Sequence, residues 1–198
     1  TLLRRQWLPA GAASGVVVMI HGFTEHSGRY AELAGELNLA GLAMETFDLR
    51  GHGRSDGPRA WIVDFDDFLS DLDQYHGLLR AEWAKVPLFL LGHSMGGLVA
   101  ARWASLRPEA VEGVILSAPA LAPGKAVFPW LRQLAPLVGF FFPRLRLAAM
   151  GSSRLSRDPA VVQAFRDDPL VVHDRFPLRS GTEMLRAMRQ VFRNSRRL

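Results

Sequence analysis

The sequence predicts an α/β fold in which helices cover both faces of a mostly parallel, doubly wound sheet. Short apolar runs typical of buried strands alternate between residues 15 and 116 with segments of helical periodicity. These runs lack the polar–apolar alternation of a half-exposed sheet, as expected for parallel strands buried on both faces. A length of 198 residues is sufficient for one domain with a substantial core.

Four buried strands are expected, at residues 15–20, 42–47, 88–91 and 111–116. Between them, apolar residues recur at helical spacing, which predicts helices at about 30–37, 65–83 and 95–106. Gly41, Pro87 and Pro108 are well placed to end these helices.

The composition excludes several kinds of site. There is no cysteine, so disulfides and thiolate metal sites are impossible, and we expect neither a metal nor an organic cofactor. The net charge is +5, and all but two of the basic residues are arginine. An arginine-biased proteome explains this better than attraction to anionic lipid headgroups. The arginines are scattered and no nucleic-acid motif occurs, so nucleic-acid binding is not expected.

The first residues lack the apolar core of a signal peptide, which favours a cytoplasmic or membrane-peripheral location over secretion.

The pattern changes at Ala118, after which prolines recur to about Arg179 and predict short helical pieces instead of further sheet. Residues 127–142 are nearly all apolar but too short and too interrupted by proline for a membrane span. They are either a helix packed on the core or an apolar lid over a site. A final helix follows within residues 180–198, for which Ser180 and Glu183 suit a capping box.

The strongest chemical signal is LFLLGHSMGG at residues 88–97, a strand followed by G-x-S-x-G and a helix. Ser94 would sit on a strained strand-to-helix turn that exposes its hydroxyl as a nucleophile. Gly92 and Gly96 must lack side chains to avoid a clash there. The Met95 N–H would lie at a helix N-terminus, where the helix dipole favours an anion. His93 is next in sequence to Ser94 and should point away from it.

A second segment, IHGFTEHSG at residues 20–28, follows the first buried strand. A serine hydrolase needs a second oxyanion donor from such a loop, and the Phe23 N–H is the natural candidate. We interpret His21 as a structural hydrogen-bonding residue. Glu25 and His26 either line the entrance or are solvated.

A third segment, DLRGHGRSDGP at residues 48–58, is a tight glycine-rich loop. Arg50, His52 and Asp56 are expected to hold its shape through hydrogen bonds and not to act in catalysis. Its G-x-G does not continue into a dinucleotide fingerprint, so a nucleotide site is not expected.

These motifs resemble a known family. In chain order, HGFTEHSGRY, FDLRGHGRSDGPRA, GHSMGGLVA and LSAPAL resemble the monoacylglycerol lipase and lysophospholipase group of serine α/β-hydrolases, which is grouped with serine-aminopeptidase-like hydrolases. SRDPAVVQAFRDDPLVVHDR resembles the cap segment of that group. The resemblance covers nearly the whole chain.

The resemblance implies an α/β-hydrolase core at residues 1–119, an inserted helical cap at 120–179, and a helix at 180–198 that returns to the core. It implies Ser94 as the nucleophile, with Phe23 and Met95 as backbone oxyanion donors. The substrate would be a lipid ester whose acyl chain lies against the apolar cap, and the cap would touch membrane surfaces.

The chain departs from the family pattern at both ends. The family's acid and histidine follow the cap, whereas here only one helix does, so the fold is expected to be incomplete at the C-terminus, with acid and base beyond this chain. TLLRRQWLPA resembles the family's second strand, so the first is missing or cut short. The strand at 111–116 would then be an exposed sheet edge, through which we expect self-association in sedimentation experiments.

The chain itself contains residues in the Ser–Asp–His order of a catalytic triad. His173 is the only histidine after Ser94, and Asp158, Asp167 and Asp168 lie between them. All of them fall in the cap segment, so we interpret them as packing and capping residues.

Two other functions are compatible with these residues. An aminopeptidase of the same fold needs an acidic group for the substrate amine, for which Glu25 is a weak candidate. A non-catalytic lipid-binding protein fits the absent base, but it has no need of Ser94 on a strained turn.

Overall fold

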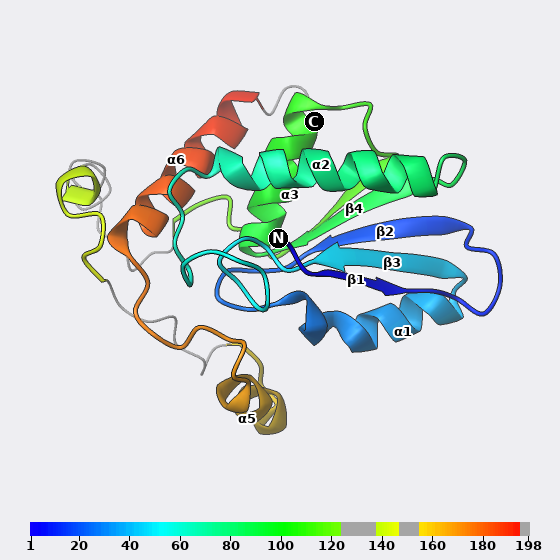
Figure 1. The fold of residues 1–198 in the computed structure, drawn as a ribbon, viewed down its shortest axis with the longest axis horizontal. Helices are drawn as coiled ribbons and strands as arrows, with labels where there is room; N and C mark the ends of the chain where they lie inside the picture. Colours follow the sequence, from blue (N-terminus) through cyan, green and yellow to red (C-terminus); the bar gives the residue numbers. More distant parts are fainter. Residues whose placement is uncertain (124–137, 147–154, 195–198) are drawn as a thin grey trace.

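The computed structural model describes residues 1–123, 138–146 and 155–194. Its centre is a five-stranded sheet with the strand order β1-β3-β2-β4-β5 (Figure 1). β1 (Arg4–Trp7) pairs antiparallel with β3 (Leu42–Phe47). β2 (Gly15–Ile20), β4 (Leu88–His93) and β5 (Gly113–Ser117) continue the sheet in parallel. The predicted mostly parallel α/β sheet is therefore confirmed.

Helices cover both faces of the sheet, as predicted (Figure 1). α1 (Ala31–Leu39) packs on one face, where Met19 and Met44 form a small cluster with its Ala34. α2 (Asp66–Glu82) and α3 (Met95–Leu106) cover the other face, which holds the main core. β2 supplies both clusters because successive side chains along a strand point to opposite faces.

The edge strand β5 differs from the expectation in two ways. It begins at Gly113, not at 111, because Glu112 is occupied with β4: its N–H donates to the Leu88 carbonyl (2.9 Å), and its carboxylate accepts from the Leu88 N–H (2.6 Å). The expectation of burial on both faces is wrong here, since Ile115 and Leu116 are 49% and 38% exposed. Self-association through this edge stays a prediction.

The described parts of the predicted cap segment contain short helical pieces joined by turns, as predicted. A helical turn lies at 138–141, and α5 spans Pro159–Asp167. Asp158 is the N-cap of α5 and accepts from the Ala160 N–H (2.8 Å). The remainder of the apolar run expected at 127–142 lies outside the described residues. Among the described helices, none is long and apolar enough to cross a membrane.

The capping box expected in the last helix is wrong. α6 (Leu178–Asn194) begins at Leu178, and Ser180 and Glu183 are buried and turned toward the core. The Ser180 hydroxyl accepts from the Ile62 N–H (3.0 Å) and donates to the Ala60 carbonyl (2.8 Å). A distant loop thus takes the hydrogen bonds that a capping box would have used locally.

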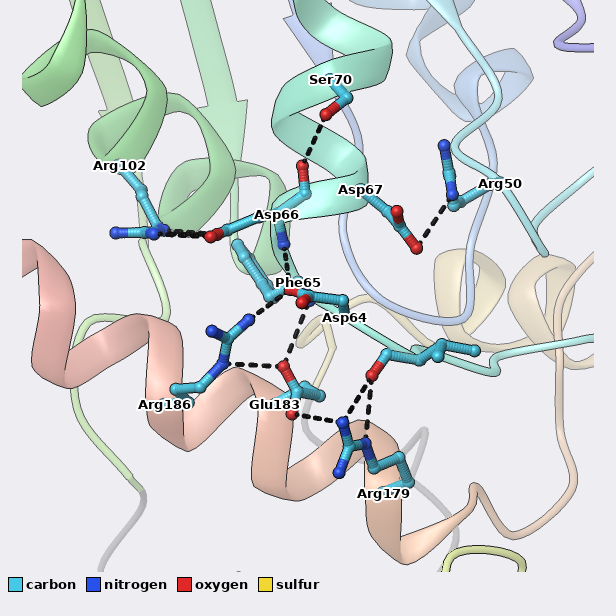
Figure 2. A network of polar contacts seen from close by, with 11 residues as sticks. Arg50, Asp64, Phe65, Asp66, Asp67, Ser70, Arg102, Arg179, Glu183 and Arg186 are labelled. Carbon is cyan, nitrogen blue, oxygen red and sulfur yellow. Dashed lines mark hydrogen bonds and ion pairs between the residues drawn. The ribbon is translucent and has the colours of Figure 1, made fainter.

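Figure 2 shows how α6 and α3 meet at the start of α2. The Glu183 carboxylate accepts from the buried Phe65 N–H (3.2 Å) and forms ion pairs with Arg179 (3.2 Å) and Arg186 (2.8 Å). From α3, Arg102 binds the Asp66 carboxylate in a bidentate manner, at 2.9 and 3.0 Å. α6 is therefore fixed to the same helix start as α3, the helix that follows Ser94.

Candidate active site

Ser94 lies on the turn between β4 and α3 with φ +51° and ψ −116°, a conformation that non-glycine residues rarely adopt. Three backbone hydrogen bonds hold it: the Ser94 N–H donates to the Ser117 carbonyl (3.0 Å), and the Ser94 carbonyl accepts from the N–H groups of Ala120 (2.9 Å) and Leu98 (3.1 Å). The predicted strained strand-to-helix turn is therefore confirmed.

The glycines on either side of Ser94 are required by close backbone packing. A Cβ on Gly96 would lie 2.1 Å from the Ile20 carbonyl oxygen, and one on Gly92 would lie 2.3 Å from the Gly96 carbonyl oxygen. Neither contact can be relieved by a side-chain rotation, because both opposing atoms belong to the backbone. The predicted reason for these two glycines is thus confirmed.

The loop after β2 lies directly against Ser94. A Cβ on Gly22 would be 3.3 Å from the Ser94 Cβ. Between the loop and the turn is a small hollow of about 60 Å³. It is lined by residues from distant parts of the chain: Gly22, Phe23, Thr24, Glu25, His93, Ser94, Leu155 and Phe165. Within the described part of the chain, no acceptor lies against the N–H of Phe23 or Met95.

His21 has the structural role predicted for it. It is fully buried, its Nε2 accepts from the Leu49 N–H (2.9 Å), and its Nδ1 lies 2.8 Å from the Gly22 carbonyl oxygen. Burial lowers the pKa of His21, which keeps the ring neutral with its proton on Nδ1. His21 therefore joins the loop after β2 to the loop after β3.

His52 is a second buried histidine behind the site. Its Nδ1 lies 2.9 Å from the Arg50 carbonyl oxygen, and its ring meets Phe23 edge-on at 5.5 Å. Burial lowers the pKa of His52 to about 3, so it packs as a neutral ring and supports Phe23 from the core side.

Glu25 lines the hollow, but its carboxylate is fully engaged. It accepts from the Gly22 N–H (2.6 Å) and the Tyr30 hydroxyl (2.7 Å), and pairs with Arg29 (3.2 Å). Burial, together with the Glu25 charge, raises the pKa of Tyr30, which keeps its hydroxyl protonated as the donor. Glu25 thus holds the loop in place.

The loop at 48–58 is held by hydrogen bonds, as predicted. Arg50 binds Asp71 in a bidentate manner, with both distances 2.7 Å. The Gly51 N–H closes the loop on the Asp56 carbonyl (2.8 Å). Burial opposes ionisation of Asp48, but hydrogen bonds from the Arg54 and Ser27 backbones outweigh it and lower the pKa of Asp48.

The histidine and aspartates that could form a triad within the chain are bonded elsewhere. His173 bonds through Nε2 to the Asp168 backbone carbonyl (3.2 Å) and lines a different hollow, beside Arg59. Asp158 caps α5, and Asp167 accepts from the Gln163 amide (2.9 Å). The interpretation of these residues as capping and packing residues is confirmed. His93 bonds through Nδ1 to the Ser117 hydroxyl (3.2 Å).

Three further residues at the site, all from the predicted cap segment, were not predicted individually. Leu155 and Phe165 line the hollow at Ser94, and Phe176 packs edge-on against Phe23 at 5.3 Å. No pattern in the sequence predicts that these residues lie against the loop after β2 or the hollow. Among the described residues, no group of three or more His, Asp or Glu is placed to bind a metal ion.

The comparisons with known proteins agree with this geometry. Residues 11–198 match the protein family described as serine aminopeptidase, S33. The chain belongs to this family, as a monoacylglycerol lipase-like α/β-hydrolase. The crystal structure of a monoacylglycerol lipase from Paleococcus ferrophilus superposes with a TM-score of 0.85 and 35% identity, covering 100% of this chain and 74% of that one.

Two curated relatives have a similar sequence identity to this chain. A monoglyceride lipase of Rattus norvegicus is 36% identical over 198 residues, covering 100% of this chain and 65% of that protein. A monoacylglycerol lipase of Mycolicibacterium smegmatis is 36% identical over 171 residues, covering 86% of this chain and 61% of that protein. The chain therefore spans less than two thirds of the length of these two relatives.

Replacing Gly96 by alanine tests the packing around Ser94. We expect Gly96→Ala to lower the free energy of unfolding by about 3 kcal/mol or more, because the new Cβ meets backbone atoms that cannot move separately. Gly77→Ala is the matched control, since nothing lies within 4 Å of its Cβ and it sits inside α2. It should raise stability by up to about 1 kcal/mol. If a denaturant titration gave the same change in the free energy of unfolding for both substitutions, close backbone packing would not be the reason for Gly96.

Proposed function

We propose that this protein is a serine ester hydrolase that forms an acyl-enzyme on Ser94. The strained turn that exposes Ser94 beside the loop after β2 carries the proposal. The N–H groups of Phe23 and Met95 act as oxyanion donors, which is supported by the lack of an acceptor against either among the described residues. Residues 1–119 form the core, 120–179 the cap, and 180–198 the return to the core.

The hydroxyl of Ser94 needs a general base to remove its proton during attack. All six histidines lie among the described residues, and those nearest the site are engaged elsewhere. His21 bonds to Leu49, His26 to Asp168, and His93 to Ser117. We therefore place the base and its acid outside the described residues.

The proposed substrate is a monoacylglycerol, a lysophospholipid or a similar carboxylic ester. The hollow at Ser94 has apolar walls from Phe23, Leu155 and Phe165, which suit an acyl chain. The similarity to monoglyceride lipases and to a phospholipase of Bacillus subtilis, 32% identical over 159 residues, supports this class. Aminopeptidase activity is less favoured, because Glu25, the candidate for binding an amine, is already bonded to Gly22, Tyr30 and Arg29. A purely lipid-binding role does not require the strain at Ser94.

Labelling with a fluorophosphonate tests the nucleophile in the whole protein, which includes the proposed base and acid. We expect one adduct, located on Ser94 by peptide mass spectrometry, and its loss in Ser94→Ala but not in Ser70→Ala, where an exposed hydroxyl on α2 is removed. An ester should be turned over faster than the matched aminoacyl amide. Absence of an adduct, or an adduct elsewhere, would overturn the proposed function; faster amide cleavage would favour the peptidase.

We also propose that the cap touches lipid surfaces through Phe140, Phe141 and Phe142, which are 70%, 65% and 64% exposed. The turn that carries them is held against α6, since a Cβ on Gly139 would lie 2.9 Å from Thr182. Three adjacent exposed phenylalanines followed by Arg144 combine apolar area with a positive charge, as interfacial segments do.

Replacing all three phenylalanines by serine should weaken binding to vesicles of neutral and anionic phospholipid by about tenfold or more, because each ring loses apolar area buried in lipid. Leu39→Ser at the end of α1 is the control, since that side chain is 85% exposed away from the cap. Co-sedimentation with vesicles measures both. Unchanged binding in the triple variant would contradict a role for this patch.

A further inference from the structure

Part of the cap runs alongside the loop that carries Phe23. The segment 165–176, which leads from the end of α5 toward α6, lies against the loop 23–29. Four contacts join them in antiparallel order. Written with the loop residue first, the pairs are Phe23–Phe176, Thr24–Val172, His26–Asp168 and Arg29–Phe165.

The central contact fixes a strained residue. Thr24 has φ +67°, in the left-handed region that a β-branched residue avoids. Its carbonyl accepts a hydrogen bond from the Val172 N–H at 2.8 Å. Phe23, the residue before it, has its ring between His52 of the core and Phe176 of the cap, at 5.5 and 5.3 Å. The cap segment therefore takes part in holding a conformation that the loop would leave if it were free.

The His26–Asp168 pair is the strongest polar link between the two segments. The distance from Nε2 to Oδ2 is 2.8 Å, and the two side chains are 8% and 20% exposed. His26 Nδ1 accepts from the Gly28 N–H (3.1 Å), so Nε2 carries a proton and donates to Asp168. The other Asp168 oxygen accepts from the Leu170 N–H (2.9 Å). Burial opposes ionisation of Asp168, but these two hydrogen bonds outweigh it and lower its pKa.

Beyond the His26–Asp168 pair, a further contact joins the loop to Phe165 in the wall of the hollow. The Arg29 guanidinium lies over the Phe165 ring at 4.7 Å, and Phe165 faces the hollow at Ser94. On the core side, Glu25 holds the Gly22 N–H. The loop is thus held between a core carboxylate at its start and the cap segment along its length.

We propose that Asp168 is a positioning residue: through His26 and the adjoining Val172–Thr24 hydrogen bond, the cap sets the direction of the Phe23 N–H. In this view the cap is part of the oxyanion site as well as a cover for the acyl chain. The inference rests on the proposed role of Phe23 in the ester hydrolase.

Substitutions at Asp168 and its neighbour test it first. Asp168→Ala removes both acceptors, and Asp168→Asn leaves one oxygen for two donors, so its effect should be intermediate. Asp167→Ala is the matched control, because that exposed neighbour accepts only from the Gln163 amide among the described residues. The first readout is hydrogen exchange of the segment 22–29, with β2 as an internal reference. We expect exchange in this segment to be faster by about tenfold or more in Asp168→Ala, with β2 and the Asp167→Ala protein unchanged.

The second readout is the rate of fluorophosphonate labelling, separated into initial binding and reaction. Asp168→Ala should slow the reaction step by about tenfold or more with little change in binding, since a misplaced donor affects the transition state. His26→Ala should slow it similarly, and the double variant should be no worse than either.

The outcomes separate the two proposals. Unchanged exchange at 22–29 in Asp168→Ala, additive effects of the two substitutions, or an equal effect of Asp167→Ala would overturn the positioning role. A parent protein that is not labelled at all would instead overturn the proposed hydrolase, while the exchange measurement still tests the contact between cap and loop.

Discussion

The packing of α3 against the end of β2 is the constraint on which the rest of the site depends. Gly96 approaches the Ile20 carbonyl so closely that a Cβ there would be 2.1 Å away. This approach forces the chain to turn within one residue, and Ser94 takes a left-handed φ of +51° as a result. Such a conformation costs of order 1–3 kcal/mol and persists only where surrounding contacts hold it. It also places Ser94 beside the loop that starts where β2 ends.

The surrounding contacts are mostly polar and buried. His21, Glu25 and Asp48 each bond to backbone groups of the loops around Ser94. A buried polar group that loses its partner costs about 1–3 kcal/mol, so these bonds restrict the loops to one arrangement. The segment 165–176 is joined to the loop after β2 in the same way, and α6 is joined to the start of α2 (Figure 2).

The sequence was sufficient where the cause of a structure is local. The strand–turn–helix around Ser94, the clash that a Cβ on Gly92 would make with Gly96, and the end of α1 at Gly41, with φ +77°, follow from backbone rules that involve residues close together in the chain.

The sequence was insufficient where distant partners compete with local ones. Ser180 was expected to cap its own helix, but it bonds to Ala60 and Ile62. Glu112 bonds to Leu88 and delays the start of β5. His26 and Asp168 are 142 residues apart, and nothing in their spacing predicts the pair. Such contacts depend on the tertiary arrangement, which sequence periodicity does not encode.

We propose that Ser94 and the N–H groups of Phe23 and Met95 form one site for an acyl transition state. A crystal structure of the protein after reaction with a phosphonate tests this proposal, because the phosphoryl oxygen occupies the place of the oxyanion. We expect phosphorus bonded to the Ser94 hydroxyl oxygen, with one phosphoryl oxygen about 2.7–3.1 Å from both the Phe23 and the Met95 nitrogen. A phosphoryl oxygen that points away from these N–H groups, or phosphorus on another residue, would contradict it.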